Sequence, residues 1–202
     1  MKFFTMFRDS ARELKNTQCI VVTGMLIAVY IVLAGIGNIY LIPGVLRINF
    51  GFLALAVIGM LYGPSVAVLA AVPCDIFALL VRGTGGFLPV FTLILMFNGF
   101  IYGIFLYGFD AKKSFWANAK LLIAHGIVVL IGRLVFNTAA QYYYGIIGGA
   151  DETLFTVISL RVVANIIQYP VNVVMLYAVL IPVKAAFPKT IGTSTEKKRK
   201  SK

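Results

Sequence analysis

Acidic residues, histidine, cysteine and tryptophan are scarce in this chain of 202 residues. It has seven aspartates and glutamates against eighteen lysines and arginines, with one histidine, two cysteines and one tryptophan. The lone histidine, His125, has no second ligand at metal-binding spacing, so we expect no metal site. Both cysteines, Cys19 and Cys74, lie inside apolar runs, and we expect buried free thiols rather than a disulfide.

Catalytic motifs are missing as well. No serine lies in the context of a nucleophile elbow, and no ATP-binding motif is present. The glycine-rich segment at residues 83–86 lacks the lysine and hydroxyl residue that complete a phosphate-binding loop, so we interpret it as a lid or a turn. The sequence therefore predicts a protein that is not an enzyme and that carries no cofactor.

Charged side chains are absent from five long stretches of the chain. Overall, 60% of the residues are hydrophobic and the mean hydropathy is +0.94, well above the range of soluble proteins. Each stretch is close to or longer than the roughly 20 residues that span a bilayer as a helix. The stretches cover residues 19–46, 48–74, 83–109, 134–150 and 162–183. This pattern predicts an all-α integral membrane protein.

We expect six transmembrane helices, separated by turn residues or charged connections. The predicted helices cover residues 19–38, 48–61, 65–81, 88–109, 116–144 and 154–184. Both ends of the chain and the connection after the fourth helix are rich in lysine, and an even number of spans puts all three on one side. The positive-inside rule then places both termini in the cytoplasm.

The two ends of the chain are predicted to lie outside a single transmembrane domain at residues 19–187. Residues 1–18 form an interfacial segment, in which phenylalanines oppose basic residues on an amphipathic helix. Residues 188–202 form a basic, disordered tail. Because the lysines flank hydrophobic segments, the net charge of +11 favours contact with the lipid bilayer and its anionic headgroups, and we expect no nucleic-acid partner.

Four arginines lie apart from the fourteen other basic residues and border or interrupt the apolar segments: Arg47, Arg82, Arg133 and Arg161. Placing an unpaired guanidinium in a bilayer costs about 3 kcal/mol or more of free energy, so such a residue indicates a functional role. Asp75 can neutralise one of the four, and the remaining acids on that side are expected in a solvated loop. At least one arginine is therefore available for an anionic ligand, and its planar fork suits a carboxylate.

Two polar stripes contain two of these arginines. The sixth helix carries Arg161, Asn165, Gln168 and Asn172 at helical spacing, and the fifth carries Arg133, Asn137, Gln141 and Tyr144. Two interpretations stay open for these stripes. They hold the bundle together by interhelical hydrogen bonds, or they line a polar cavity that opens outward. The excess of arginine over acid favours the cavity.

Aromatic residues gather toward the expected outer half of the helices. An interfacial aromatic belt accounts for many of them. Beside arginines they can also stack a flat heteroaromatic ligand, and we expect Phe50, Phe91 and Tyr143 to do so. Asn98 in the fourth helix completes the set of candidate binding residues.

The sequence resembles the substrate-binding (S) components of energy-coupling-factor (ECF) vitamin transporters, and most closely their folate family. The matching parts are residues 12–16, 46–52, 59–64 and 86–93, together with Asp75, Arg133, Asn137, Thr138, Arg161, Asn165 and Pro170. The sequence departs from the folate pattern at Ala164, Asn172 and Tyr142–Tyr143, where lysine, an acid and a nearby tryptophan are usual.

The resemblance implies a subunit of a bacterial plasma-membrane transporter. Such a subunit captures a vitamin at the outer face, joins a transmembrane coupling subunit and two cytoplasmic ATPase subunits, and topples to release its cargo inside. In the family, a pair of small residues on the first helix meets the coupling subunit, matched here by Gly24 and Ala28. The family's gating loops correspond to residues 41–46 and 82–89.

The leading hypothesis is uptake of folate or a related anionic vitamin, whose carboxylates pair with some of the four arginines. A second hypothesis keeps the transporter and changes the cargo to pantothenate, a queuosine precursor or another small vitamin. A membrane enzyme or scaffold is a third hypothesis, for which the sequence offers no catalytic residues.

Overall fold

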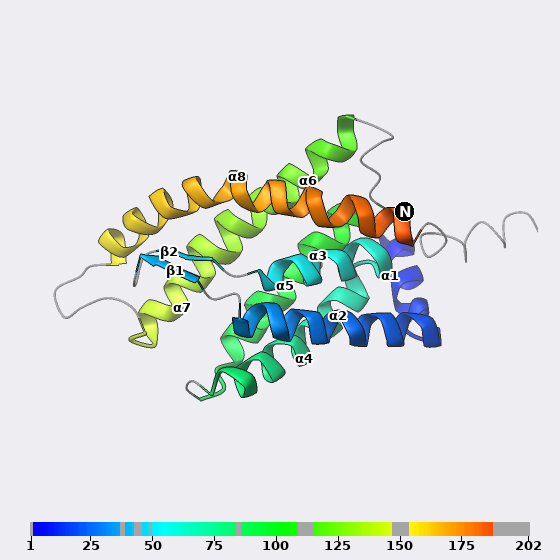
Figure 1. The fold of residues 1–202 in the computed structure, drawn as a ribbon, viewed down its shortest axis with the longest axis horizontal. Helices are drawn as coiled ribbons and strands as arrows, with labels where there is room; N and C mark the ends of the chain where they lie inside the picture. The colour runs from blue at the N-terminus through cyan, green and yellow to red at the C-terminus, as the bar shows by residue number, and fades with distance from the viewer. Residues whose placement is uncertain are drawn as a thin grey trace, which may run out of the picture.

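Helices make up almost all of the described chain, as expected from its long apolar segments with few charged side chains (Figure 1). The structure is a computed structural model that describes residues 2–36, 39–42, 46–48, 50–83, 86–108, 115–146 and 154–187. The helices are α1 (Lys2–Glu13), α2 (Thr17–Ile36), α3 (Gly51–Tyr62), α4 (Pro64–Arg82), α5 (Pro89–Leu106), α6 (Phe115–Ile127), η1 (Val128–Asn137), α7 (Thr138–Tyr143) and α8 (Leu154–Ala186).

Five helices in the described part of the chain are long and apolar enough to cross a membrane. They lie at Thr17–Gly35, Pro64–Val81, Pro89–Leu106, Asn118–Tyr143 and Ile158–Ala186. The predicted second helix exists as α3, but it has only 12 residues and every one of them is buried. At 1.5 Å per residue it is about 18 Å long, shorter than the bilayer core, and it fills the middle of the bundle.

A short β-hairpin follows α2 and is a small addition to the predicted all-α fold. Strand β1 (Ile39–Ile42) pairs antiparallel with β2 (Leu46–Ile48), and Tyr40 lies opposite Arg47. The sequence carries the signal for this hairpin, because isoleucine-rich segments flank Pro43 and Gly44. The hairpin, α7 and the start of α8 lie at the end of the molecule opposite α1 (Figure 1).

The helices α3, α4 and α5 pack very closely around glycine. A Cβ atom on Gly103 would lie 2.3 Å from Pro64 Cα, and one on Gly99 would lie 2.9 Å from the Ala67 carbonyl oxygen. A Cβ atom on Gly59 would lie 2.9 Å from the backbone nitrogen of Gly103. The three helices therefore approach one another so closely that these positions have room only for glycine.

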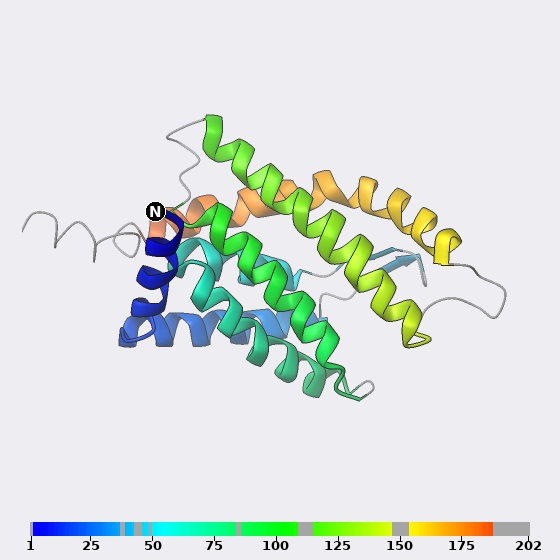
Figure 2. The same ribbon diagram turned by 180° about the vertical axis from the view of Figure 1, so that it is seen from behind.

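Helix α1 lies across one end of the bundle, crosswise to α2 (Figures 1 and 2). Its Ser10 side chain is completely buried and donates a 2.6 Å hydrogen bond to the carbonyl of Tyr62. The same oxygen accepts from the backbone N–H of Ser65 at 3.1 Å, so that it caps the start of α4. Ser65 Oγ in turn donates to the Phe7 carbonyl at 3.1 Å.

The acidic side chains of α1 lie close to the end of α5. Burial, followed by the nearby charges of Glu13 and Asp9, raises the pKa of Tyr107. The residues opposite Ser10 on the helix, Arg8 and Arg12, are exposed. Helix α1 therefore has an exposed basic face and a buried face that packs on the protein.

The two cysteines and the histidine are buried, as expected. Cys19 and Cys74 are free thiols with no exposed surface. His125 is also fully buried, and its Nδ1 shares a 2.9 Å hydrogen bond with the hydroxyl of Tyr102. Its ring packs against those of Phe52 and Tyr169, so it belongs to the core, as the sequence indicates.

Candidate functional site

A cavity of about 640 Å³ lies between α3, α4 and α5 on one side and η1, α7 and α8 on the other. This volume is in the range of small-molecule binding sites. Seven of the eleven predicted binding residues line it: Phe91, Asn98, Arg133, Asn137, Arg161, Asn165 and Gln168. Six of the eight members of the two polar stripes thus face a common cavity, which is the favoured interpretation of their spacing, whereas Tyr144 and Asn172 do not line it.

Two predicted aromatic contacts do not reach this cavity. Phe50 packs against the hydrophobic core beside α3. Tyr143 is 83% exposed and lines a separate apolar groove together with Tyr144. The side chains of Arg47 and Arg82 lie outside the described part of the chain. The backbone of Arg47 pairs with that of Tyr40 in the β-hairpin, and Arg82 is the last residue of α4. The predicted gating segments likewise contain residues that are not described.

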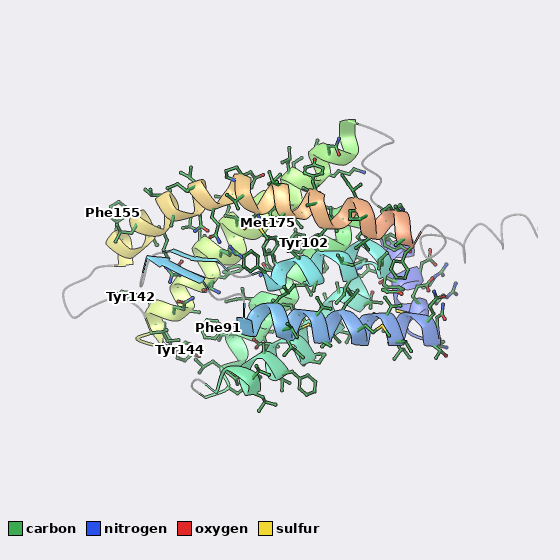
Figure 3. All side chains as sticks on the ribbon, viewed as in Figure 1. Phe91, Tyr102, Tyr142, Tyr144, Phe155 and Met175 are labelled. Carbon is green, nitrogen blue, oxygen red and sulfur yellow. The ribbon has the colours of Figure 1, made fainter. Side chains whose placement is uncertain are left out.

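Other aromatic residues take the place of Phe50 and Tyr143. Phe52, Phe87 and Tyr30 line the cavity beside Phe91. Phe91 and Tyr102 lie toward the interior, whereas Tyr142, Tyr144 and Phe155 lie at the end opposite α1 (Figure 3). Phe50 precedes α3, which begins at Gly51, whereas Phe52 lies on that helix and lines the cavity.

Arg161 is held in the cavity wall by neutral groups. Its guanidinium donates to Thr138 Oγ1 at 3.3 Å and to Gln141 Oε1 at 3.0 Å. Its backbone carbonyl accepts from Asn165 Nδ2 at 2.8 Å. These contacts orient the side chain without cancelling its charge. Since a guanidinium carries five N–H donors, others remain for a bound anion.

Arg133 lies on η1 with its guanidinium carbon 5.6 Å from the ring centre of Phe52, in a cation–π contact. The ten residues of η1 form a π-helix, which has wider turns than an α-helix. The hydroxyl of Thr138 donates to the Arg133 carbonyl at 3.2 Å, and Gln141 Nε2 donates to Asn137 Oδ1. The π-helix thus sets how Arg133 is placed relative to Gln141 in the wall.

Asp75 brings a carboxylate to the α4 side of the cavity. Its Oδ2 accepts a 2.6 Å hydrogen bond from Thr92 Oγ1, on α5. The sequence identifies Asp75 as a partner for an arginine, and the structure adds that it lines the cavity itself. The site therefore has a cationic wall at Arg133 and Arg161, a carboxylate at Asp75, and aromatic rings in its lining.

Comparison with known proteins identifies the family. Residues 18–180 match the family model of the ECF transporter substrate-specific component. The chain belongs to this family. Its members are transport subunits and not enzymes, which agrees with the missing catalytic motifs. As an ECF substrate-specific component with five helices able to span a membrane, the chain is a multi-pass membrane protein.

Three curated relatives of this ECF component carry the name folate transporter FolT. That of Streptococcus mutans is 34% identical over 147 residues, 70% of this chain and 75% of the relative. That of Clostridium novyi is 29% identical over 66% of this chain and 72% of its own length. That of Leuconostoc mesenteroides is 27% identical over 82% and 85%.

A solved structure shares the fold of this ECF component. It is a crystal structure of FolT bound with folic acid, with a TM-score of 0.65 and 27% sequence identity. The match covers 80% of this chain and 92% of the solved one.

Proposed function

We propose that this ECF component binds folate and delivers it for uptake. The observation that carries the proposal is the cavity itself, with two arginines on one wall and a carboxylate on the other. Folate has a flat pterin ring with N–H donors at one end and a glutamate with two carboxylates at the other. The three named relatives and the folic acid complex of FolT support the same ligand.

The charges of the cavity define an orientation for folate. Its carboxylates pair with Arg161 and Arg133, because two guanidiniums in a partly buried site attract anions strongly. Its pterin ring stacks on Phe91 and donates hydrogen bonds to Asp75, whose carboxylate is already oriented by Thr92. Asn98, Asn137, Asn165 and Gln168 complete the polar lining.

The proposal includes a membrane topology. The chain spans a bacterial plasma membrane six times, with the short α3 as the sixth crossing and both termini in the cytoplasm. The α3 helix is apolar and wholly buried, which supports its place within the bilayer. Its partners are a transmembrane coupling subunit and two ATPase subunits. Gly24 and Ala28 are exposed on α2, and a Cβ on Gly24 would meet nothing within 4 Å, so this face is open to a partner helix.

Folic acid binding to the purified full-length protein tests the ligand. Removing a charged hydrogen-bond donor costs about 1.5–3 kcal/mol, so Arg161→Gln and Arg133→Gln are each expected to weaken binding about 10- to 100-fold. Arg8→Gln is the matched control, because Arg8 is an exposed arginine of α1, which lies across the far end of the bundle. Unchanged affinity in both cavity variants would contradict the assignment.

The cargo can be checked independently of mutation. Mass spectrometry of small molecules released from the purified protein is expected to show a folate. If pantothenate or a queuosine precursor is released instead, the assignment as a transporter subunit stands and the proposed ligand is replaced. Purification with two ATPases and one membrane subunit tests the assembly separately, because that result does not depend on which vitamin is bound.

A further inference from the structure

A second hollow, of about 490 Å³, lies on the outside of the helix bundle between α5 and the η1–α7 segment. Its α5 wall is formed by Val90, Leu93 and Phe97, and its other wall by Phe136, Ala139 and Tyr143. All of its lining side chains are apolar or tyrosine. We call this hollow the α5–η1 groove.

Aromatic pairs lie at both ends of the α5–η1 groove. At one end, the rings of Phe97 and Phe136 meet edge to face with centroids 5.5 Å apart. At the other end, Tyr143 and Tyr144 meet in the same manner at 5.4 Å. Along α5, the groove runs from residue 90 to residue 97, which is roughly 10 Å at 1.5 Å per residue.

The groove and the substrate cavity share one lining residue. Ile94 lines both spaces and is only 7% exposed, whereas Ala140, which is 8% exposed, lines the groove but not the cavity. Small side chains at Ala139 and Ala140 create the hollow, since a larger residue at either position would fill it. Whatever lies in the groove therefore supports the wall of the cavity from outside.

The position of the groove decides what can fill it. Both of its sides belong to membrane-spanning segments, Pro89–Leu106 and Asn118–Tyr143. The neighbouring surface is apolar and exposed, with Leu93 62% and Leu130 61% accessible, so it faces lipid hydrocarbon. The groove is too small for a partner helix, because 10 Å of helix fills roughly 800 Å³. It also has no charged group to receive the carboxylates of folate.

We propose that the α5–η1 groove binds one acyl chain of a membrane phospholipid. The chain end lies at the Phe97–Phe136 contact, and the tyrosines lie at the level of the headgroup, where amphipathic rings are favoured. The acyl chain makes dispersion contacts with the side chains that line the groove, which an empty hollow would lack. It thereby holds η1, which carries Arg133, at a fixed spacing from α5.

Native mass spectrometry of the full-length protein tests the proposal. The protein is reconstituted in vesicles of phosphatidylglycerol and phosphatidylethanolamine, then stripped with detergent until only tightly held lipid remains. Ala139→Trp fills the groove, whereas Leu130→Trp adds the same ring at an exposed apolar position of η1 that does not line it. We expect wild type and Leu130→Trp to keep one phospholipid. The fraction of Ala139→Trp protein that retains a lipid is expected to be lower by at least about tenfold.

Several outcomes would overturn the proposal. Equal lipid retention in Ala139→Trp and wild type would do so, as would complete loss from wild type under the same stripping. Displacement of the retained lipid by folic acid would assign the groove to the substrate site instead. If Ala139→Trp fails to fold, Leu93→Gln serves as a second variant, since it places a polar group in an exposed groove wall. The comparison of lipid retention between the variants is made before any folic acid is added, so failure of the proposed ligand leaves that comparison intact.

Discussion

Thr138 shows how single residues organise the cationic wall. Its hydroxyl donates to the Arg133 carbonyl at 3.2 Å and accepts from Arg161 at 3.3 Å. One side chain therefore links both cavity arginines, although they lie on different helices. The sequence places Thr138 beside Asn137, but nothing in a stripe of four-residue steps indicates that it bridges the two. Such a contact depends on the distance between helices, which local pattern does not contain.

Gly103 is the residue at which packing is least tolerant. An added Cβ would lie 2.3 Å from Pro64 Cα, which is backbone and has no rotamer to change. Gly103→Ala is therefore expected to lower stability by about 3 kcal/mol, through separation of α4 and α5. Thermal unfolding in detergent measures this loss.

Gly24→Ala provides the control for that substitution. It makes the same change within a membrane-spanning helix, but the new Cβ would have no neighbour within 4 Å. We expect its melting temperature to equal or exceed that of wild type, because alanine favours a helix. Similar melting temperatures for the two variants would mean that the close approach of α4 and α5 does not limit stability.

At the scale of secondary structure, the helices that end at turns or charges follow from the sequence. The predicted range 154–184 compares with Leu154–Ala186 for α8, and 88–109 with Pro89–Leu106 for α5. The π-helix η1 does not follow, since its apolar residues suit either type of helix. Its wider turns change the phase of the stripe, and Tyr144, the last member of the stripe, lines the apolar groove instead of the cavity.

Helix α1 leads to a prediction at this scale. Ser10→Ala removes the acceptor for two N–H groups of α4, those of Ser65 and Val66, and the donor to Tyr62. Leaving buried groups unsatisfied costs about 1–3 kcal/mol, so we expect a lower melting temperature and faster proteolysis of α1. Ser159→Ala is the control, because the Ser159 hydroxyl is exposed and bonds only within its own helix at 2.8 Å. Equal losses in the two variants would argue against a role for the cap.

At the scale of the whole molecule, the family and its fold could be recognised from sequence because uncharged runs, glycines and spaced arginines are spread over most of the chain. The details of the cavity could not. Asp75 was expected as a counter-charge, yet its place in the lining depends on how α4 meets α5 through Thr92. The α5–η1 groove has no sequence signal at all, since two adjacent alanines are common in any helix.

The two ends of the molecule are predicted to face opposite sides of the membrane. In a background of Cys19→Ala and Cys74→Ala, a cysteine at Phe155 is expected to react with a membrane-impermeant maleimide applied to intact cells. Phe155 is 79% exposed at the start of α8, opposite α1 (Figure 3). A cysteine at Lys15 is expected to react only after permeabilisation. The reverse pattern would invert the topology and place the cavity mouth inside.

The burial of Ser10 also constrains how the chain is made. Its hydrogen-bond partners begin 52 residues later in the sequence, so α1 leaves the ribosome well before the turn that receives it. Until α3 and α4 have entered the bilayer, this amphipathic helix has only the membrane surface to rest on. Docking of α1 is thus one of the later steps of assembly, although it involves the first residues to be synthesised.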